Sequence, residues 1–98
     1  MDYEAMRIDL VNAGVRAGTT DGFVSALKET EALQLAILRA ARRGEPQVAT
    51  MLRGDFDKSR RKLGEAVKEI MAQSAEAGTK VRATCEGDGL LASDKSPP

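Results

Sequence analysis

Apolar residues recur every three or four positions along most of the chain, which is the spacing of one face of an α-helix. In the first half this pattern predicts a helix over about residues 5–43. Gly14 and Gly18 interrupt it, and each costs about 1 kcal/mol relative to Ala in a helix interior. We therefore expect a weak point near residues 14–20, with a firm restart because capping residues stand at 19–21.

The second half carries the same periodicity over about residues 46–86. From Leu63 to Val81 the positions on one helix face are separated by four, three, four, three and four residues. This heptad seam favours one long, continuous helix. Residues 87–98 are mostly small and polar and end with two prolines, a composition that predicts a flexible tail. Within this tail, the Leu90-Leu91 pair is a candidate for contact with the helices.

The connection between the two predicted helices has a definite chemistry. Arg42 falls in the last turn of the first helix, where a cation is favoured by the negative end of the helix dipole. Gly44 suits the left-handed conformation that ends a helix, and Pro46 suits the first position of the next one. Because the turn at 44–46 is so short, the two helices must run antiparallel. The predicted fold class is therefore all-α, with a two-helix hairpin over residues 1–86.

This sequence has more apolar side chains than the single shared face of a two-helix hairpin can bury. The surplus consists of Val24, Leu35, Leu38, Met51 and Met71. Two arrangements would cover it: a four-helix-bundle dimer of two hairpins, or a monomer in which residues 5–18 fold back. We favour the dimer, with a partner interface formed by Phe23, Leu27, Ile37, Leu52, Phe56, Leu63, Val67, Ile70 and Val81.

Composition removes several kinds of chemistry. The 98 residues include no histidine and one cysteine, so the commonest metal ligand and an intrachain disulfide are both excluded. We expect Cys85 to pack as a small apolar residue rather than to pair with a partner's cysteine. The N-terminus is acidic where a signal peptide would be basic, and no apolar run approaches the roughly 18 residues of a membrane span. No enzyme activity, cofactor or metal is predicted.

Two short motifs match known patterns by chance. Ser59 and Lys62 fit the S-x-x-K pattern of serine acyl enzymes, but the accompanying S-D-N and K-T-G motifs are missing. Residues 53–55 spell Arg-Gly-Asp, yet they fall inside a predicted helix, whereas recognition of that tripeptide requires an exposed loop.

Positive charge gathers around the turn, because residues 39–62 carry eight basic and three acidic side chains. Such a region could bind phosphates or an acidic protein. Phe56 is its only aromatic residue, so no platform for stacking bases is expected. Ordinary solvated charge is the favoured interpretation, and nucleic acid is not a favoured partner.

The stretch Leu63-Gly64-Glu65-Ala66-Val67, continuing through Ile70 to Glu76-Ala77-Gly78 and Thr84, resembles a known helix. It is similar to the C-terminal helix of the early secreted antigenic target proteins, in the W-x-G family of small type VII secretion substrates. The turn departs from that family, because Arg42-Arg43-Gly44 replaces W-x-G. The export signal also departs, since a tyrosine should stand four residues before an acid, and this chain has Val81 before Cys85 or Arg82 before Glu86.

The resemblance implies a small secretion substrate or export partner that forms a homodimer or a heterodimer with a similar helical protein. Such a protein would present its tail to a secretion ATPase and leave the cell without cleavage of a signal peptide, or remain cytoplasmic if it is not exported. The alternative is an intracellular adaptor or regulator whose basic turn docks on nucleic acid or an acidic protein. A phage protein or secretion chaperone of the same shape is a third interpretation.

Overall fold

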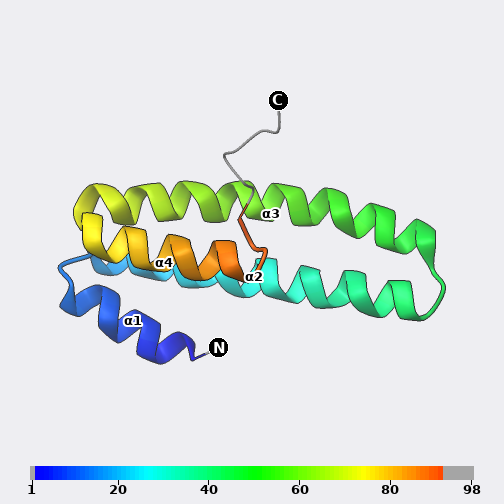
Figure 1. Ribbon diagram of the computed structural model, residues 1–98, viewed down its shortest axis with the longest axis horizontal. Helices are drawn as coiled ribbons and strands as arrows, with labels where there is room; N and C mark the ends of the chain where they lie inside the picture. Colours follow the sequence, from blue (N-terminus) through cyan, green and yellow to red (C-terminus); the bar gives the residue numbers. More distant parts are fainter. Residues whose placement is uncertain (1, 92–98) are drawn as a thin grey trace.

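The computed structural model describes residues 2–91, and within that range it consists of α-helices with no strand. The predicted all-α class is therefore confirmed. The remaining residues, Met1 and 92–98, lie outside the described part of the chain, and so does most of the predicted tail. Figure 1 shows the helices in order: α1 (Tyr3–Asn12), α2 (Ala17–Arg42), α3 (Pro46–Gln73) and α4 (Ala75–Gly87).

The break between α1 and α2 overlaps the stretch where the glycines predict a weak point. Gly14 adopts the left-handed conformation with φ +93°, and Val15 returns its N–H to the carbonyl of Leu10 at 3.0 Å. Both Leu10 and Val15 are buried, so this turn is also part of the core. The expected capping residues at 19–21 lie inside α2, because the helix begins earlier, after Arg16 as its N-cap.

The connection between α2 and α3 uses the residues that its chemistry indicates. Gly44 has φ +69° and donates its N–H to the carbonyl of Ala41 at 3.2 Å, which closes the end of α2. Pro46 occupies the start of α3, where its missing N–H is not needed. The two helices lie side by side and run in opposite directions (Figure 1).

The predicted continuous helix over 46–86 is wrong. At Ser74 the backbone becomes extended, with φ −153° and ψ 103°, and the Ser74 hydroxyl accepts a hydrogen bond from the N–H of Ala77 at 3.3 Å. Ser74 therefore caps the start of α4, which folds back along α3. The fold-back brings Val81, at one end of the heptad seam, into the same buried cluster as Leu63 at the other end.

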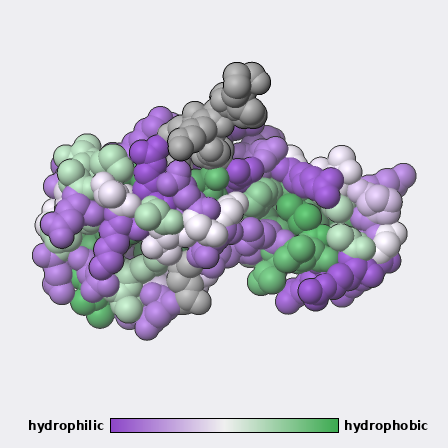
Figure 2. Space-filling model, viewed as in Figure 1, coloured by the Kyte–Doolittle hydropathy of each residue, from purple (hydrophilic) through white to green (hydrophobic). Residues whose placement is uncertain are grey.

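The molecule is longer than a compact domain because α4 covers only part of the α2–α3 pair. The Cα radius of gyration is 14.4 Å, whereas a compact chain of this length has about 13 Å. Beyond the end of α4, α2 and α3 continue together to their turn (Figures 1 and 2). We call this projecting part, residues 35–56, the arm.

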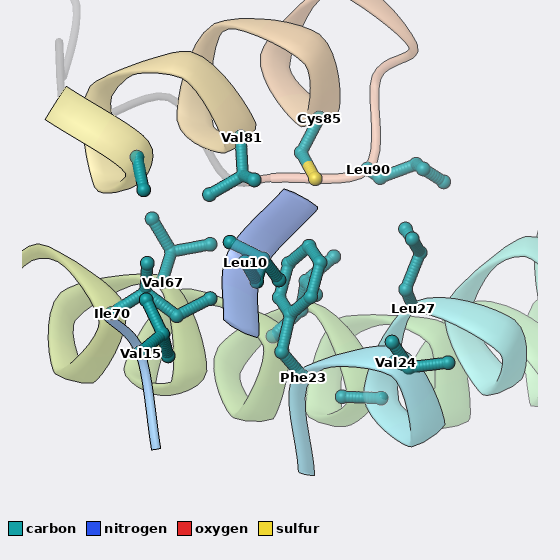
Figure 3. Packing of buried hydrophobic residues seen from close by; sticks show 13 residues of the cluster. Leu10, Val15, Phe23, Val24, Leu27, Val67, Ile70, Val81, Cys85 and Leu90 are labelled. Atoms are coloured by element: carbon teal, nitrogen blue, oxygen red, sulfur yellow. The ribbon is translucent and has the colours of Figure 1, made fainter. Parts of the chain in front are cut away.

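The core lies at the other end of the molecule, where all four helices meet (Figure 3). Phe23 and Leu27 of α2 and Leu63 and Ile70 of α3 are fully buried there. After α4, Gly89 turns the chain with φ +74°, which brings the equally buried Leu90 into the same cluster. Leu91 also packs against this core, so the predicted contact of the Leu90-Leu91 pair is observed, and residues 87–91 do not belong to a free tail.

Candidate interaction surface

Most of the residues predicted to face a partner lie inside the chain itself. Phe23, Leu27, Leu63, Val67, Ile70 and Val81 are all buried in the core cluster. The expectation of a partner interface is corrected for these six. The reason is α4, which folds back and supplies the apolar cover that the sequence pattern assigns to a second molecule (Figure 3).

The other three predicted interface residues lie on the arm or at its edge. Ile37, Leu52 and Phe56 are partly buried, because α2 and α3 cover only one side of each. Larger exposure is found nearby: Leu35 is 52% exposed, Leu38 50% and Met51 64%. Figure 2 shows hydrophobic surface gathered on the arm, beside the hollow that separates it from the four-helix end.

Small side chains hold the arm together and leave the larger ones outside. Ala40 of α2 and Ala49 of α3 are both buried in the seam between the helices. At the base of the arm, the hydroxyls of Thr30 and Ser59 form a buried hydrogen bond of 2.7 Å. Ser59 is thus engaged with Thr30, while Lys62, the other residue of the S-x-x-K match, is exposed.

The place where α4 ends forms an edge across α2 and α3, which we call the step. On α2, the Gln34 amide donates to the carbonyl of Asp88 at 3.1 Å, and the Tyr3 hydroxyl at the start of α1 donates to Glu31. On α3, the Arg60 guanidinium donates to the carbonyl of Leu91 at 3.1 Å. The step therefore consists of Tyr3, Glu31, Gln34, Arg60, Asp88 and Leu91.

α1 and α4 cover one face of the α2–α3 pair as far as the step. Beyond the step, the same face of α2 and α3 is not covered by another helix of the described chain. Residues four apart lie on the same face of a helix, so Leu35 follows Glu31 and Leu38 follows Gln34 on this face. On α3 the same spacing places Phe56 one turn beyond Arg60, and the Arg60 guanidinium lies 5.2 Å from the centre of the Phe56 ring. The arm thus extends an apolar face for about 15 Å, the length of ten helical residues.

The far end of the arm is basic and fully accessible. Arg39, Arg42, Arg43 and Arg53 are all exposed there, and Glu45 is the acidic residue between them. Arg42 and Gly44 thus keep the predicted turn positions, with the arginine side chain exposed on the outside of the molecule. We call these residues, 39–45 together with Arg53, the tip.

The residues compared with an export signal divide between the two faces of α4. Val81 and Cys85 point into the core, whereas Arg82 and Glu86 lie on the outside and form an ion pair of 4.0 Å. Burial raises the pKa of the Cys85 thiol to about 11, and the nearby carboxylates of Asp88, Glu31 and Glu86 act in the same direction. Cys85 therefore packs as a neutral side chain.

Comparison with protein-family models, with curated proteins and with solved structures finds no match to this chain. Across residues 2–91, no helix is both long and apolar enough to cross a membrane. The same residues hold no cluster of three or more acidic or cysteine side chains placed to bind a metal ion.

Proposed function

We propose that this protein acts through protein–protein interaction and pairs with a second helical protein over the uncovered face of the arm. The single observation that carries this proposal is the continuation of an apolar face past the step into solvent. Leu35 and Leu38, each about half exposed, form this face together with the partly buried Leu52 and with Phe56, which also packs against the core. A helical partner would extend the layer that α4 begins and complete a four-helix bundle around the arm.

The available energy suits a reversible complex. Leu35 and Leu38 are about half exposed, so covering the rest of both side chains contributes about 1.5–3 kcal/mol in all. The corresponding face of the partner contributes a similar amount. Since association itself costs several kcal/mol, these side chains alone do not supply the roughly 8 kcal/mol of a micromolar complex, so we expect weak pairing with exchange of partners.

A role in export is the more specific part of the proposal. The resemblance to the W-x-G family supports a small secretion substrate or export partner of the type VII kind, which would travel as a homodimer or heterodimer. Arg82 and Glu86 are accessible on α4, where secretion machinery such as an ATPase could reach them. The protein would then be found outside the cell with its N-terminus intact.

The alternative function uses the tip instead of the apolar face. Four exposed arginines at the end of a projecting arm favour binding to the phosphates of nucleic acid or to an acidic protein. The nucleic-acid form of this alternative requires retention on duplex DNA that falls steeply with salt. It leaves the apolar face of the arm unexplained, which is why pairing is the preferred proposal.

A photo-crosslinking amino acid in place of Leu38 tests the pairing proposal in the cells that make the protein. We expect it to form an adduct with one helical protein, which mass spectrometry would identify. The matched control places the same amino acid at Glu69, which is exposed on α3 outside the arm and should give no such adduct. No adduct at Leu38, or equal adducts at both positions, would contradict the proposal.

A further inference from the structure

We propose that α1 is a detachable strap that limits the length of the uncovered apolar face, and that it opens at Gly14 while α2, α3 and α4 stay folded. This inference rests on the proposed function, because it concerns the regulation of the same apolar face. The few buried side chains of α1, its polar contacts with α2 and the line of residues beneath it carry the inference.

The helix α1 is short and buries little of its own surface. It has 10 residues, whereas isolated helices shorter than about 12–15 residues are marginal in water. Leu10 is its buried residue, and Tyr3 and Met6 pack against the core while staying partly exposed. Ile8 is 51% exposed and Val11 48%. The stability of α1 therefore depends on a small number of contacts with the rest of the chain.

These contacts are made with α2, on which α1 rests at the edge of the molecule (Figure 1). A groove of about 500 Å³ lies between α1 and α4. Met6, Asp9 and Leu10 line it on one side, and Ala77 and Lys80 on the other. Because α1 and α4 are not packed closely together, α1 can leave without disturbing α4.

Polar contacts hold α1 on α2. The Tyr3 hydroxyl donates a hydrogen bond to Glu31, and the Arg7 guanidinium donates one to Asp21. The Arg7 and Asp21 side chains are 41% and 55% exposed, so water competes for this ion pair. Contacts of this kind contribute little net free energy, because both partners bond to water when the helix leaves.

The connection between α1 and α2 places a hinge beside a fixed point. Gly14 is left-handed, with φ +93°, and a methyl group added there would meet nothing within 4 Å. Just after it, the N–H of Arg16 donates to the Gln73 side chain of α3 at 2.8 Å, and the Gln73 amide donates to the Thr19 hydroxyl at 2.8 Å. These bonds fix the start of α2 on the end of α3. Rotation at Gly14 would therefore move α1 and leave α2 in place.

The part of α2 beneath α1 precedes the arm on the same helix face. Along this face, at spacings of four, three and four residues, lie Val24, Lys28, Glu31 and Leu35. The Tyr3 ring lies 5.1 Å from the Lys28 ammonium, whereas Leu35, one turn beyond Glu31, is 52% exposed. Opening of α1 would join the covered stretch to the arm. The uncovered face of α2 would then lengthen by about 16 Å, from Leu35 back to Val24.

Hydrogen exchange of the free protein tests the strap without any partner. We expect the amides from residue 6 to residue 13 to exchange together, with protection factors at least about tenfold lower than those of α4. The matched comparison is α4 because it is also short, at 13 residues, but packs closely on α3 at Gly78. If α1 is as protected as α4, or if it only frays from its first residues while the Leu10 amide stays as protected as α4, the strap is overturned.

A variant with Tyr3→Phe and Arg7→Gln links the strap to pairing. It removes both polar contacts with α2 and keeps the aromatic ring. We expect the protection of α1 to fall by about five- to tenfold, with that of α2 and α3 unchanged. The yield of the adduct from Leu38 should rise severalfold, because more of the protein then presents the longer face. The control, Lys68→Gln, removes an exposed ion pair with Glu65 on α3 and should change neither quantity.

Different outcomes separate the two proposals. Equal protection of α1 and α4 overturns the strap, whereas an adduct from Leu38 would still support the proposed function. Faster exchange of α1 in the variant without a higher adduct yield would mean that α1 does not regulate pairing, which also overturns the inference. If no adduct forms at Leu38 in any of these proteins, the proposed function is removed, and the regulatory role of α1 with it.

Discussion

Cys85 lies in the hydrophobic core, with the carboxylates of Asp88, Glu31 and Glu86 nearby. Its side chain has no exposed surface, and burial together with Asp88, Glu31 and Glu86 raises its pKa to about 11. A thiol with a raised pKa is a poor nucleophile at neutral pH. The residue therefore contributes packing, as the sequence predicts for a lone cysteine near the end of an amphipathic helix.

The shifted pKa predicts a loss of stability in alkali. The reference pKa of the thiol is 9.0, whereas the folded value is about 11, so between these values the folded state binds more protons than the unfolded state. The stabilising contribution of the protonated thiol is complete below pH 9 and is lost as the pH rises towards 11. Across this window we expect the free energy of unfolding of the wild type to fall by about 1–3 kcal/mol more than that of Cys85→Ala.

Urea denaturation at pH 8.5 and at pH 11 measures this difference. Cys85→Ala leaves a small cavity and lowers stability at both values, so the change with pH is the quantity to compare. Tyr3, whose pKa its hydrogen bond to Glu31 raises to about 12, is present in both proteins and cancels. Equal changes with pH in the two proteins would contradict the prediction.

At the scale of the elements, α3 and α4 approach each other closely at Gly78. A methyl group added at Gly78 would come within 2.5 Å of the Met71 Cα and 2.8 Å of its backbone nitrogen. Backbone atoms cannot move aside as a flexible side chain can. Gly78 thus permits α4 to fold back tightly enough for Val81 to reach the core.

We therefore expect Gly78→Ala to lower the free energy of unfolding by about 1–3 kcal/mol, since overpacking opposes any gain in helix propensity. The matched control is Gly22→Ala within α2, where an added methyl group meets nothing within 4 Å. The free energy of unfolding of the Gly22→Ala variant should rise by up to about 1 kcal/mol. Urea denaturation of both proteins measures the pair, and a stabilised Gly78→Ala would show that α4 does not need this close approach.

The break at Ser74 shows how one polar residue redirects an element. In the heptad pattern Ser74 occupies a seam position that would otherwise be apolar. There its hydroxyl caps the start of α4, and its carbonyl still accepts the N–H of Gly78 at 2.9 Å. A serine in an apolar seam was the local sign of this break, but helical periodicity alone does not distinguish a cap from a tolerated polar residue.

At the scale of the whole molecule, the homodimer form of the proposed pairing through the arm predicts that thermal stability depends on protein concentration. Because a dimer stabilises the folded state by mass action, the Tm of wild type should rise between about 5 and 500 μM. Leu38→Gln should remove most of this rise while leaving the Tm of the dilute protein nearly unchanged, since Leu38 is half exposed.

Leu27→Ala is the contrasting variant in this experiment. Leu27 is fully buried in the core, so its truncation should cost about 2–5 kcal/mol and lower the Tm at every concentration. Scanning calorimetry over the concentration series measures all three proteins. A wild-type Tm that stays constant with concentration would contradict self-pairing through the arm.

The sequence by itself determined the all-α class, the chemistry of the turn at Gly44 and Pro46, and the surplus of apolar side chains that includes Leu35 and Leu38. These follow from local rules, because periodicity, capping and backbone conformation depend on residues a few positions apart. Only the tertiary structure decided that Val81 and Leu90 cover the core from within, and that the arm beyond the step stays uncovered. A pattern specifies which side chains must leave water, whereas the chain's path decides which surface covers them.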